Sequence, residues 1–133
     1  MEEKLTPNPN RLGALQLAYI GDAVYEIYVR RFLLQSGDIK SSSLQQRAEK
    51  LVKAQAQHEA LEAIRPLLSE EECRIVRRGR NQKHKNKPKN ATAQEYNNAT
   101  GLESLIGYLY LHRRMGRLDE IIQTILHKAC QDV

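Results

Sequence analysis

The chain has 133 residues, with 21 lysines and arginines against 16 aspartates and glutamates, and its length suits one domain spanning residues 1–133. Its two cysteines, Cys73 and Cys130, lie far apart in no metal-like spacing, which argues against a disulfide framework or a zinc site and predicts reduced thiols. The acidic, polar start MEEKLTPNPN and the absence of an apolar run of about 18 residues argue against a secretory signal and a membrane span, so we expect a cytoplasmic protein.

Apolar residues recur at helical spacing along most of the chain, without strand-like alternation, which predicts an all-α domain. The first helix is expected over about residues 11–35, ending at Ser36-Gly37. Three later helices are expected to begin at capping boxes: Ser43 with Gln46, Ser69 with Glu72, and Thr92 with Glu95. These helices are expected to end at three places: Pro66, Gly79 and the Met115-Gly116 pair. A last amphipathic helix follows at about residues 118–129.

Positive charge is concentrated in one segment of the chain. Residues 74–89 contain eight basic residues and no acidic one, whereas elsewhere 13 basic residues face 16 acidic ones. The stretch RNQKHKNKPKNA at residues 80–91 lacks apolar periodicity, so we expect an exposed basic loop at about residues 77–91. This concentration favours local docking of a polyanion, with a merely solvated loop as the alternative. The residues expected to contact phosphates are Arg77, Arg78, Arg80, Asn81, Lys83, Lys85, Lys87 and Lys89.

Two carboxylates lie on otherwise apolar helix faces. One face of the first helix contains Leu15, Ala18, Asp22, Tyr25 and Val29, and one face of a later helix contains Ala99, Glu103, Ile106 and Tyr110. Each helix also has a glycine near its acid, Gly21 and Gly107. A glycine costs about 1 kcal/mol in a helix interior, which is understandable if the two helices approach closely.

We therefore expect Asp22 to be buried among apolar side chains and to face Glu103. Burying a carboxylate is unfavourable unless it is paired or binds a metal, so the two acids are expected to share a hard cation such as magnesium. The alternative is that either acid pairs with an arginine or lies at the rim of the apolar face. The spacing of residues along the chain does not decide between these alternatives.

The stretch AYIGDAVYEIYV resembles the signature helix of the ribonuclease III family, which reads roughly L-E-F-L-G-D-A-V-L, and TGLESLIGYLYL resembles its second motif, D-x-x-E-A-L-I-G. The resemblance covers nearly the whole chain and is to the stand-alone Mini-ribonuclease III branch, which lacks a double-stranded-RNA-binding domain. It implies that Asp22 is the catalytic aspartate and Glu103 the essential metal-binding glutamate. Both would be catalytic residues and ligands of Mg²⁺, with Mn²⁺ as a substitute.

Where the wider family has carboxylates, this chain has Leu15, Ala18 and Thr100. Fewer protein ligands are therefore implied, and water or RNA phosphate would complete the coordination of the metal. The resemblance implies a ribonuclease III-like helical fold and a homodimer in which each protomer cuts one strand of double-stranded RNA. The branch matures the precursor of large-subunit (23S) ribosomal RNA, which is the implied substrate and partner. The alternative is a non-catalytic helical RNA-binding module or ribosome-assembly factor, in which the two acids hold the core.

Overall fold

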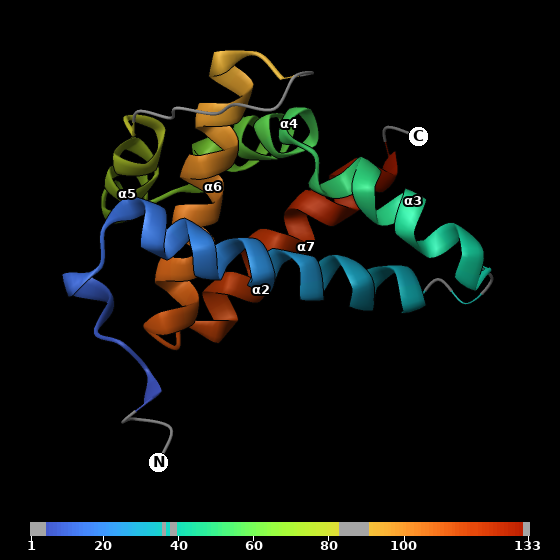
Figure 1. The fold of residues 1–133 in the computed structure, drawn as a ribbon, viewed down its shortest axis with the longest axis horizontal. Coiled ribbons are helices and arrows are strands. Elements are labelled where there is room, and N and C mark those ends of the chain that lie inside the picture. Colours follow the sequence, from blue (N-terminus) through green and yellow to red (C-terminus); the bar gives the residue numbers. More distant parts are fainter. Residues whose placement is uncertain (1–4, 36, 38–39, 83–90, 132–133) are drawn as a thin grey trace.

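The computed structural model describes residues 5–35, 37, 40–82 and 91–131, and Figure 1 shows how its helices are arranged. Within these residues the regular elements are helices and none is a strand, so the predicted all-α class is confirmed. The α-helices are α2 (Ala14–Gln35), α3 (Ser41–Val52), α4 (Ala54–Ile64), α5 (Glu70–Arg80), α6 (Ala93–Leu111) and α7 (Met115–Gln131). Two short 3-10 helices are η1 (Pro9–Arg11) and η2 (Arg65–Leu67).

Helix α6 is the central element of the fold. It packs against α2, α4, α5 and α7, and Figure 1 shows α2 crossing in front of it. Its fully buried side chains include Leu102, Leu105, Ile106 and Leu109. Neighbouring helices cover α6 on most sides, and its buried residues accordingly occur around most of its circumference rather than along one stripe.

Glycines allow the neighbouring helices to approach α6 closely. A Cβ atom on Gly21 of α2 would lie 1.8 Å from the carbonyl oxygen of Glu103, and one on Gly107 of α6 would lie 2.0 Å from the carbonyl oxygen of Leu17. The expected close approach of these two helices is therefore confirmed. A second contact of this kind pairs α5 with α6, because a Cβ on Gly79 would lie 2.8 Å from the Cα of Gly101. Gly79 thus packs against α6, and α5 ends one residue later, at Arg80, so the expected end of this helix near Gly79 is confirmed.

The first helix begins later than expected, at Ala14 rather than near Arg11. Pro9 starts the short helix η1, and Leu12 is extended with φ of −90° and ψ of 142°, which separates η1 from α2. The side chain of Gln16 accepts a hydrogen bond from the Gly13 backbone N–H at 2.9 Å and so caps the new start. Beyond the end of α2, Gly37 has a φ of +82°, a conformation that glycine adopts readily.

Two of the three capping boxes are confirmed, those of Ser69 with Glu72 and Thr92 with Glu95. The third is wrong, because α3 begins at Ser41 and its N-cap residue makes no side-chain hydrogen bond. The expected continuous helix up to Pro66 is also divided in two. Lys53 is extended, with φ of −64° and ψ of 157°, and separates α3 from α4.

The turn between α6 and α7 does not lie at Met115-Gly116, which instead begins α7. The helix ends because Arg113 adopts the left-handed conformation, with φ of 59°. The backbone N–H of Arg113 bonds to the carbonyl of Tyr110 at 3.0 Å, and that of Arg114 bonds to the carbonyl of Leu109 at 2.9 Å. These two bonds form a Schellman motif, which usually has glycine at the left-handed position. The arginine there explains why the sequence pattern misplaced the turn.

The two cysteines are free thiols, as expected. In the part of the chain that the structure describes, no helix combines the length and the apolar character of a membrane span.

Candidate active site

The crossing of α2 and α6 brings Asp22 and Glu103 together. Asp22 follows Gly21, the glycine whose Cα faces the backbone of Glu103 at the point of closest approach. The carboxyl groups are near enough for Asp22 to act on Glu103 through both its charge and a side-chain hydrogen bond. The two acids are far apart in the sequence but adjacent in the fold, because Gly21 and Gly107 let the backbones of α2 and α6 come into contact.

The environment of Glu103 disfavours its charged form. The side chain is half-buried, and burial raises the pKa of its carboxyl group to about 8, with the charge of Asp22 as the second cause. Tyr25 lies one turn after Asp22 and is 2% exposed. Burial raises the pKa of its hydroxyl well above the usual range, and the charge of Glu103 adds to this effect. Glu103 therefore sits on the buried side of the α2–α6 crossing.

The expected burial of Asp22 is wrong, because its side chain is exposed in the protomer. The apolar stripe of α2 is wider than the surface that packs on α6. Ala18, Tyr25 and Val29 are buried, whereas Leu15 is 45% exposed. Asp22 lies at the edge between these two parts of the stripe, at the rim of the core.

The alternative in which an arginine neutralises one of the acids finds no support among the described residues. The ion pairs there join Arg30 to Glu26, Arg65 to Glu62, Arg114 to Glu71, and Arg117 to both Glu72 and Glu120. None of these pairs includes Asp22 or Glu103. The two carboxyl groups face each other without a basic side chain between them in this part of the molecule.

Gln57 on α4 is a third polar residue at the site, and the sequence reasoning missed it. Its side chain is 3% exposed, and its Nε2 donates to Oε2 of Glu103 at 3.3 Å and to the carbonyl of Val52 at 2.8 Å. The sequence does contain a pattern that indicates this residue, because Gln57 shares a helix face with the buried Ala60, Leu61 and Ile64. A lone polar residue on an apolar stripe is the same pattern that identified Asp22.

The side chains at this crossing fit one hard divalent cation. Among the described residues there is no group of three or more His, Cys, Asp or Glu side chains placed to hold a metal, so the protein offers two carboxylates. Leu15, Ala18 and Thr100 add no further carboxylate. Oxygen donors in small number suit Mg²⁺ or Mn²⁺, which retain water ligands. A cation would also remove the mutual repulsion that contributes to the raised pKa of Glu103.

Half of the predicted phosphate-binding residues lie in the described part of the chain. Arg77 and Arg78 are exposed on the last turn of α5, and Asn81, the C-cap residue, is exposed beside them. Arg80 is half-buried, and the structure shows no hydrogen-bond partner for its Nε atom. The remaining four, Lys83, Lys85, Lys87 and Lys89, lie outside the described residues.

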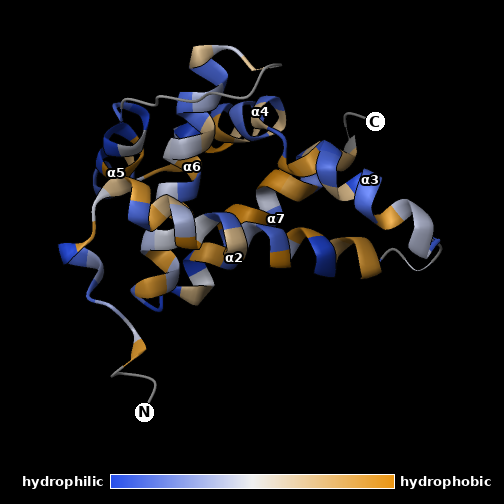
Figure 2. Cartoon of the chain, viewed as in Figure 1, coloured by the Kyte–Doolittle hydropathy of each residue, from blue (hydrophilic) through white to orange (hydrophobic). Residues whose placement is uncertain are grey.

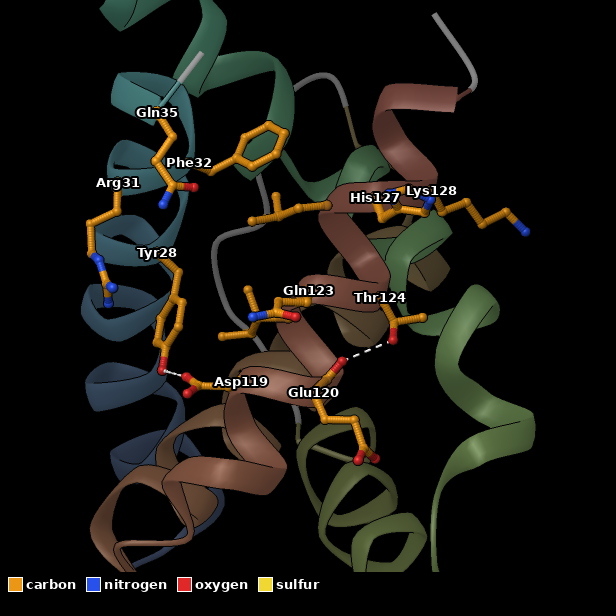
Figure 3. Close-up of a pocket in the computed structure, with 12 residues that line it drawn as sticks. Tyr28, Arg31, Phe32, Gln35, Asp119, Glu120, Gln123, Thr124, His127 and Lys128 are labelled. Atoms are coloured by element: carbon orange, nitrogen blue, oxygen red, sulfur yellow. Dashed lines mark hydrogen bonds between the residues drawn. The ribbon is translucent and has the colours of Figure 1, made fainter. Parts of the chain in front are cut away.

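A separate hollow of about 890 Å³ lies between α2 and α7, and Figure 3 shows the side chains that line it. Tyr28 of α2 donates a hydrogen bond across it to Asp119 of α7. The lining also includes the basic residues Arg31 and Lys128. Neither Asp22 nor Glu103 lines this hollow, so it is distinct from the paired carboxylates.

Comparison with known proteins agrees with the motifs. A family profile described as "Ribonuclease III domain" matches residues 15–114. A Mini-ribonuclease 3 of Symbiobacterium thermophilum is 46% identical over 87% of this chain and 89% of its own length. One from Brevibacillus brevis is 43% identical over 92% of this chain and 91% of its own length. A crystal structure of a Fusobacterium nucleatum protein matches with a TM-score of 0.81 at 30% identity, over 90% of this chain and 95% of that chain.

Proposed function

The chain belongs to the ribonuclease III family, and we propose that it is a magnesium-dependent endoribonuclease that cleaves double-stranded RNA as a homodimer. The observation that carries this proposal is the meeting of Asp22 and Glu103 at the α2–α6 crossing, with no basic partner among the described residues. One or two carboxylates are the usual protein ligands of Mg²⁺, which can activate water for hydrolysis.

The two carboxylates have different tasks in the proposed mechanism. When bound, Mg²⁺ supplies a Lewis acid for the scissile phosphate and a water ligand of lowered pKa. Asp22 is exposed, so its carboxylate would hold the cation where water and phosphate can also reach it. Glu103 holds it from the buried side and must release its proton to do so. Cation affinity should therefore increase with pH up to about 8, the raised pKa of Glu103.

The proposed dimer forms through the outer face of α2. Four large apolar side chains on this helix are exposed: Leu15 at 45%, Tyr19 at 81%, Ile27 at 58% and Leu34 at 66%. With 3.6 residues per turn they fall on one side of the helix. No other helix covers the near side of α2 in Figure 1, and Figure 2 shows apolar residues along its length.

A second copy of the chain is the occupant that this face suits, because a two-fold axis would pack one α2 stripe against the other. Glu26 and Arg30, joined at 3.0 Å, lie on the same side and supply charges of both signs, so a two-fold pairing would bring opposite charges within reach. Asp22 borders the stripe, so each carboxylate pair would lie at the edge of the interface. Two such sites related by the axis would serve the two strands of a duplex.

The basic segment supplies the proposed RNA contacts. Duplex RNA is recognised mainly through phosphates, 2′-hydroxyls and shape, which exposed Arg77 and Arg78 can contact. Lys83, Lys85, Lys87 and Lys89 extend the same run of positive charge. The precursor of 23S ribosomal RNA is the substrate that we propose, because the sequence motifs resemble those of the Mini-ribonuclease III branch.

Cleavage of a plain RNA duplex tests the proposal. We expect cleavage with Mg²⁺ and none with a chelator, and an Asp22→Asn variant that binds the duplex but cleaves it at least about 100-fold more slowly, a loss of roughly 2.7 kcal/mol. Asp119→Asn is the matched control, because Asp119 is an exposed aspartate that lines the α2–α7 hollow. Binding without cleavage by the parent protein would instead support the non-catalytic alternative. A loss of less than about tenfold in Asp22→Asn would reject the role of Asp22.

A further inference from the structure

Gln57 is placed by the break between α3 and α4. The chain leaves α3 at Val52, extends at Lys53 and begins α4 at Ala54, which turns the apolar face of α4 toward α6. Gln57 lies one turn into α4 on this face, with its backbone N–H bonded to the Lys53 carbonyl at 3.0 Å. A carboxamide is thereby carried into the interior, next to Glu103.

The orientation of this carboxamide is determined by its neighbours. Its Nε2 lies 2.8 Å from the Val52 carbonyl and 3.3 Å from Oε2 of Glu103, and the Val52 carbonyl can only accept a hydrogen bond. Turning the amide over would place its oxygen against the Val52 carbonyl oxygen, so the donating orientation is the one that the site permits. Each of the two N–H bonds therefore has its own acceptor.

We propose that Gln57 is a positioning residue that orients the carboxylate of Glu103 toward Asp22 and the bound cation. The inference rests on the proposed function and adds a residue to it. By holding Oε2 of Glu103, the amide fixes the rotation of the carboxylate. Such supporting hydrogen bonds to metal ligands commonly change metal affinity by about 10- to 100-fold.

A purely structural role for Gln57 explains only part of what is seen. The Val52 carbonyl ends α3 and needs a donor, but one N–H of the amide satisfies it. The Oε1 atom of Gln57 is buried without a partner in the structure, which costs about 1–3 kcal/mol for such a group. Burying a carboxamide here therefore gives little net stability, while its second N–H is directed to a carboxylate at the site.

The test compares Gln57→Met, which keeps the length but loses both donors, with Asn98→Ala as a matched control. Asn98 is 0% exposed and also joins α6 to α4, through a contact of 2.6 Å between its Nδ2 and Nδ1 of His58, without touching either acid. Two quantities are measured for each variant: the rate of duplex cleavage against Mg²⁺ concentration, and the rise in unfolding temperature caused by Mg²⁺ without RNA.

We expect Gln57→Met to require at least about tenfold more Mg²⁺ than the parent in both measurements. Asn98→Ala should be less stable than the parent yet keep its Mg²⁺ midpoints within about twofold, because it leaves Glu103 untouched. If Gln57→Met does not fold, Gln57→Leu takes its place, since leucine also has no donor for Glu103 and suits the apolar face of α4. Unchanged Mg²⁺ midpoints in the folded Gln57 variant would overturn the inference. The unfolding measurement tests Gln57 even if the parent fails to cleave RNA, a failure that would count against the proposed function alone.

Discussion

Replacing Glu103 by glutamine should change how the stability of the metal-free protein depends on pH. Burial and Asp22 raise the pKa of the Glu103 carboxyl group from 4.5 to about 8 in the folded chain. Between these pH values the folded chain holds a proton at this position that the unfolded chain has lost. The free energy of unfolding therefore falls as pH rises through this interval and levels off above it. Glutamine resembles the protonated acid at every pH, so Glu103→Gln lacks this loss.

The size of the effect follows from the interval between the two pKa values. At about 1.4 kcal/mol per pKa unit, a shift from 4.5 to about 8 corresponds to roughly 5 kcal/mol. Glu103 keeps some contact with solvent, which screens its interactions, so we expect on the order of 3 kcal/mol. Glu103→Gln should thus be close to the parent in stability near about pH 5 and more stable by about 3 kcal/mol near about pH 9.

Urea unfolding in a chelator, at one fixed chain concentration, measures this difference. Other titrating groups affect both proteins alike, so the difference between them isolates Glu103. The same comparison in an Asp22→Asn background should give a smaller rise with pH, because the charge of Asp22 is the second cause of the shift after burial. Mg²⁺ should stabilise the parent at high pH more than Glu103→Gln. A stability difference between Glu103→Gln and the parent that is the same at both pH values would refute the reasoning.

Three further predictions concern assembly, packing and RNA binding. Light scattering should report about 31 kDa for the parent, twice its 15.3 kDa chain, and the monomer mass for Ile27→Asp. Leu67→Asp, which changes an exposed leucine outside α2, should remain dimeric. Gly107→Ala should reduce the free energy of unfolding by about 3 kcal/mol or more, because its Cβ would lie 2.0 Å from the Leu17 carbonyl oxygen. The control Gly116→Ala should not destabilise the protein, because a Cβ there meets nothing within 4 Å. Changing Lys83, Lys85 and Lys87 to alanine should lower the slope of log affinity against log salt by about two to three units without lowering the unfolding temperature; an unchanged slope would show that these lysines do not contact RNA.

The features that could be predicted from the sequence are those that depend on local spacing. Thr92 with Glu95 and Ser69 with Glu72 form the expected capping boxes, because a capping box needs only a few consecutive residues. The close approach at Gly21 and Gly107 could also be predicted, since a glycine inside a helix is unfavourable unless the backbone needs the space.

The features that could not be predicted depend on contacts between distant parts of the chain. No glycine or proline marks the break at Lys53. The break turns Gln57 and the apolar face of α4 toward α6, and this contact joins residues that are far apart in the sequence. The turn at Arg113 has a left-handed arginine where glycine is usual, so the nearby Gly116 wrongly indicated the position of the helix end. Gln57 carries no charge, so its place on an apolar stripe is a weaker sign of a functional site than that of Asp22.

Asp22 shows why apolar periodicity alone cannot tell which side of a helix face is buried. The apolar positions of α2 serve two surfaces: Leu17 and Tyr25 pack in the core, and Tyr19 and Ile27 remain exposed. Periodicity combines the two sets into one broad stripe and places Asp22 within it. In the protomer the acid is exposed, and in the proposed assembly the exposed apolar side chains of α2 would pack against a partner subunit. In the proposed dimer, a carboxylate at this border would be anchored by the core of its own protomer, flanked by the partner subunit, and still open to the RNA.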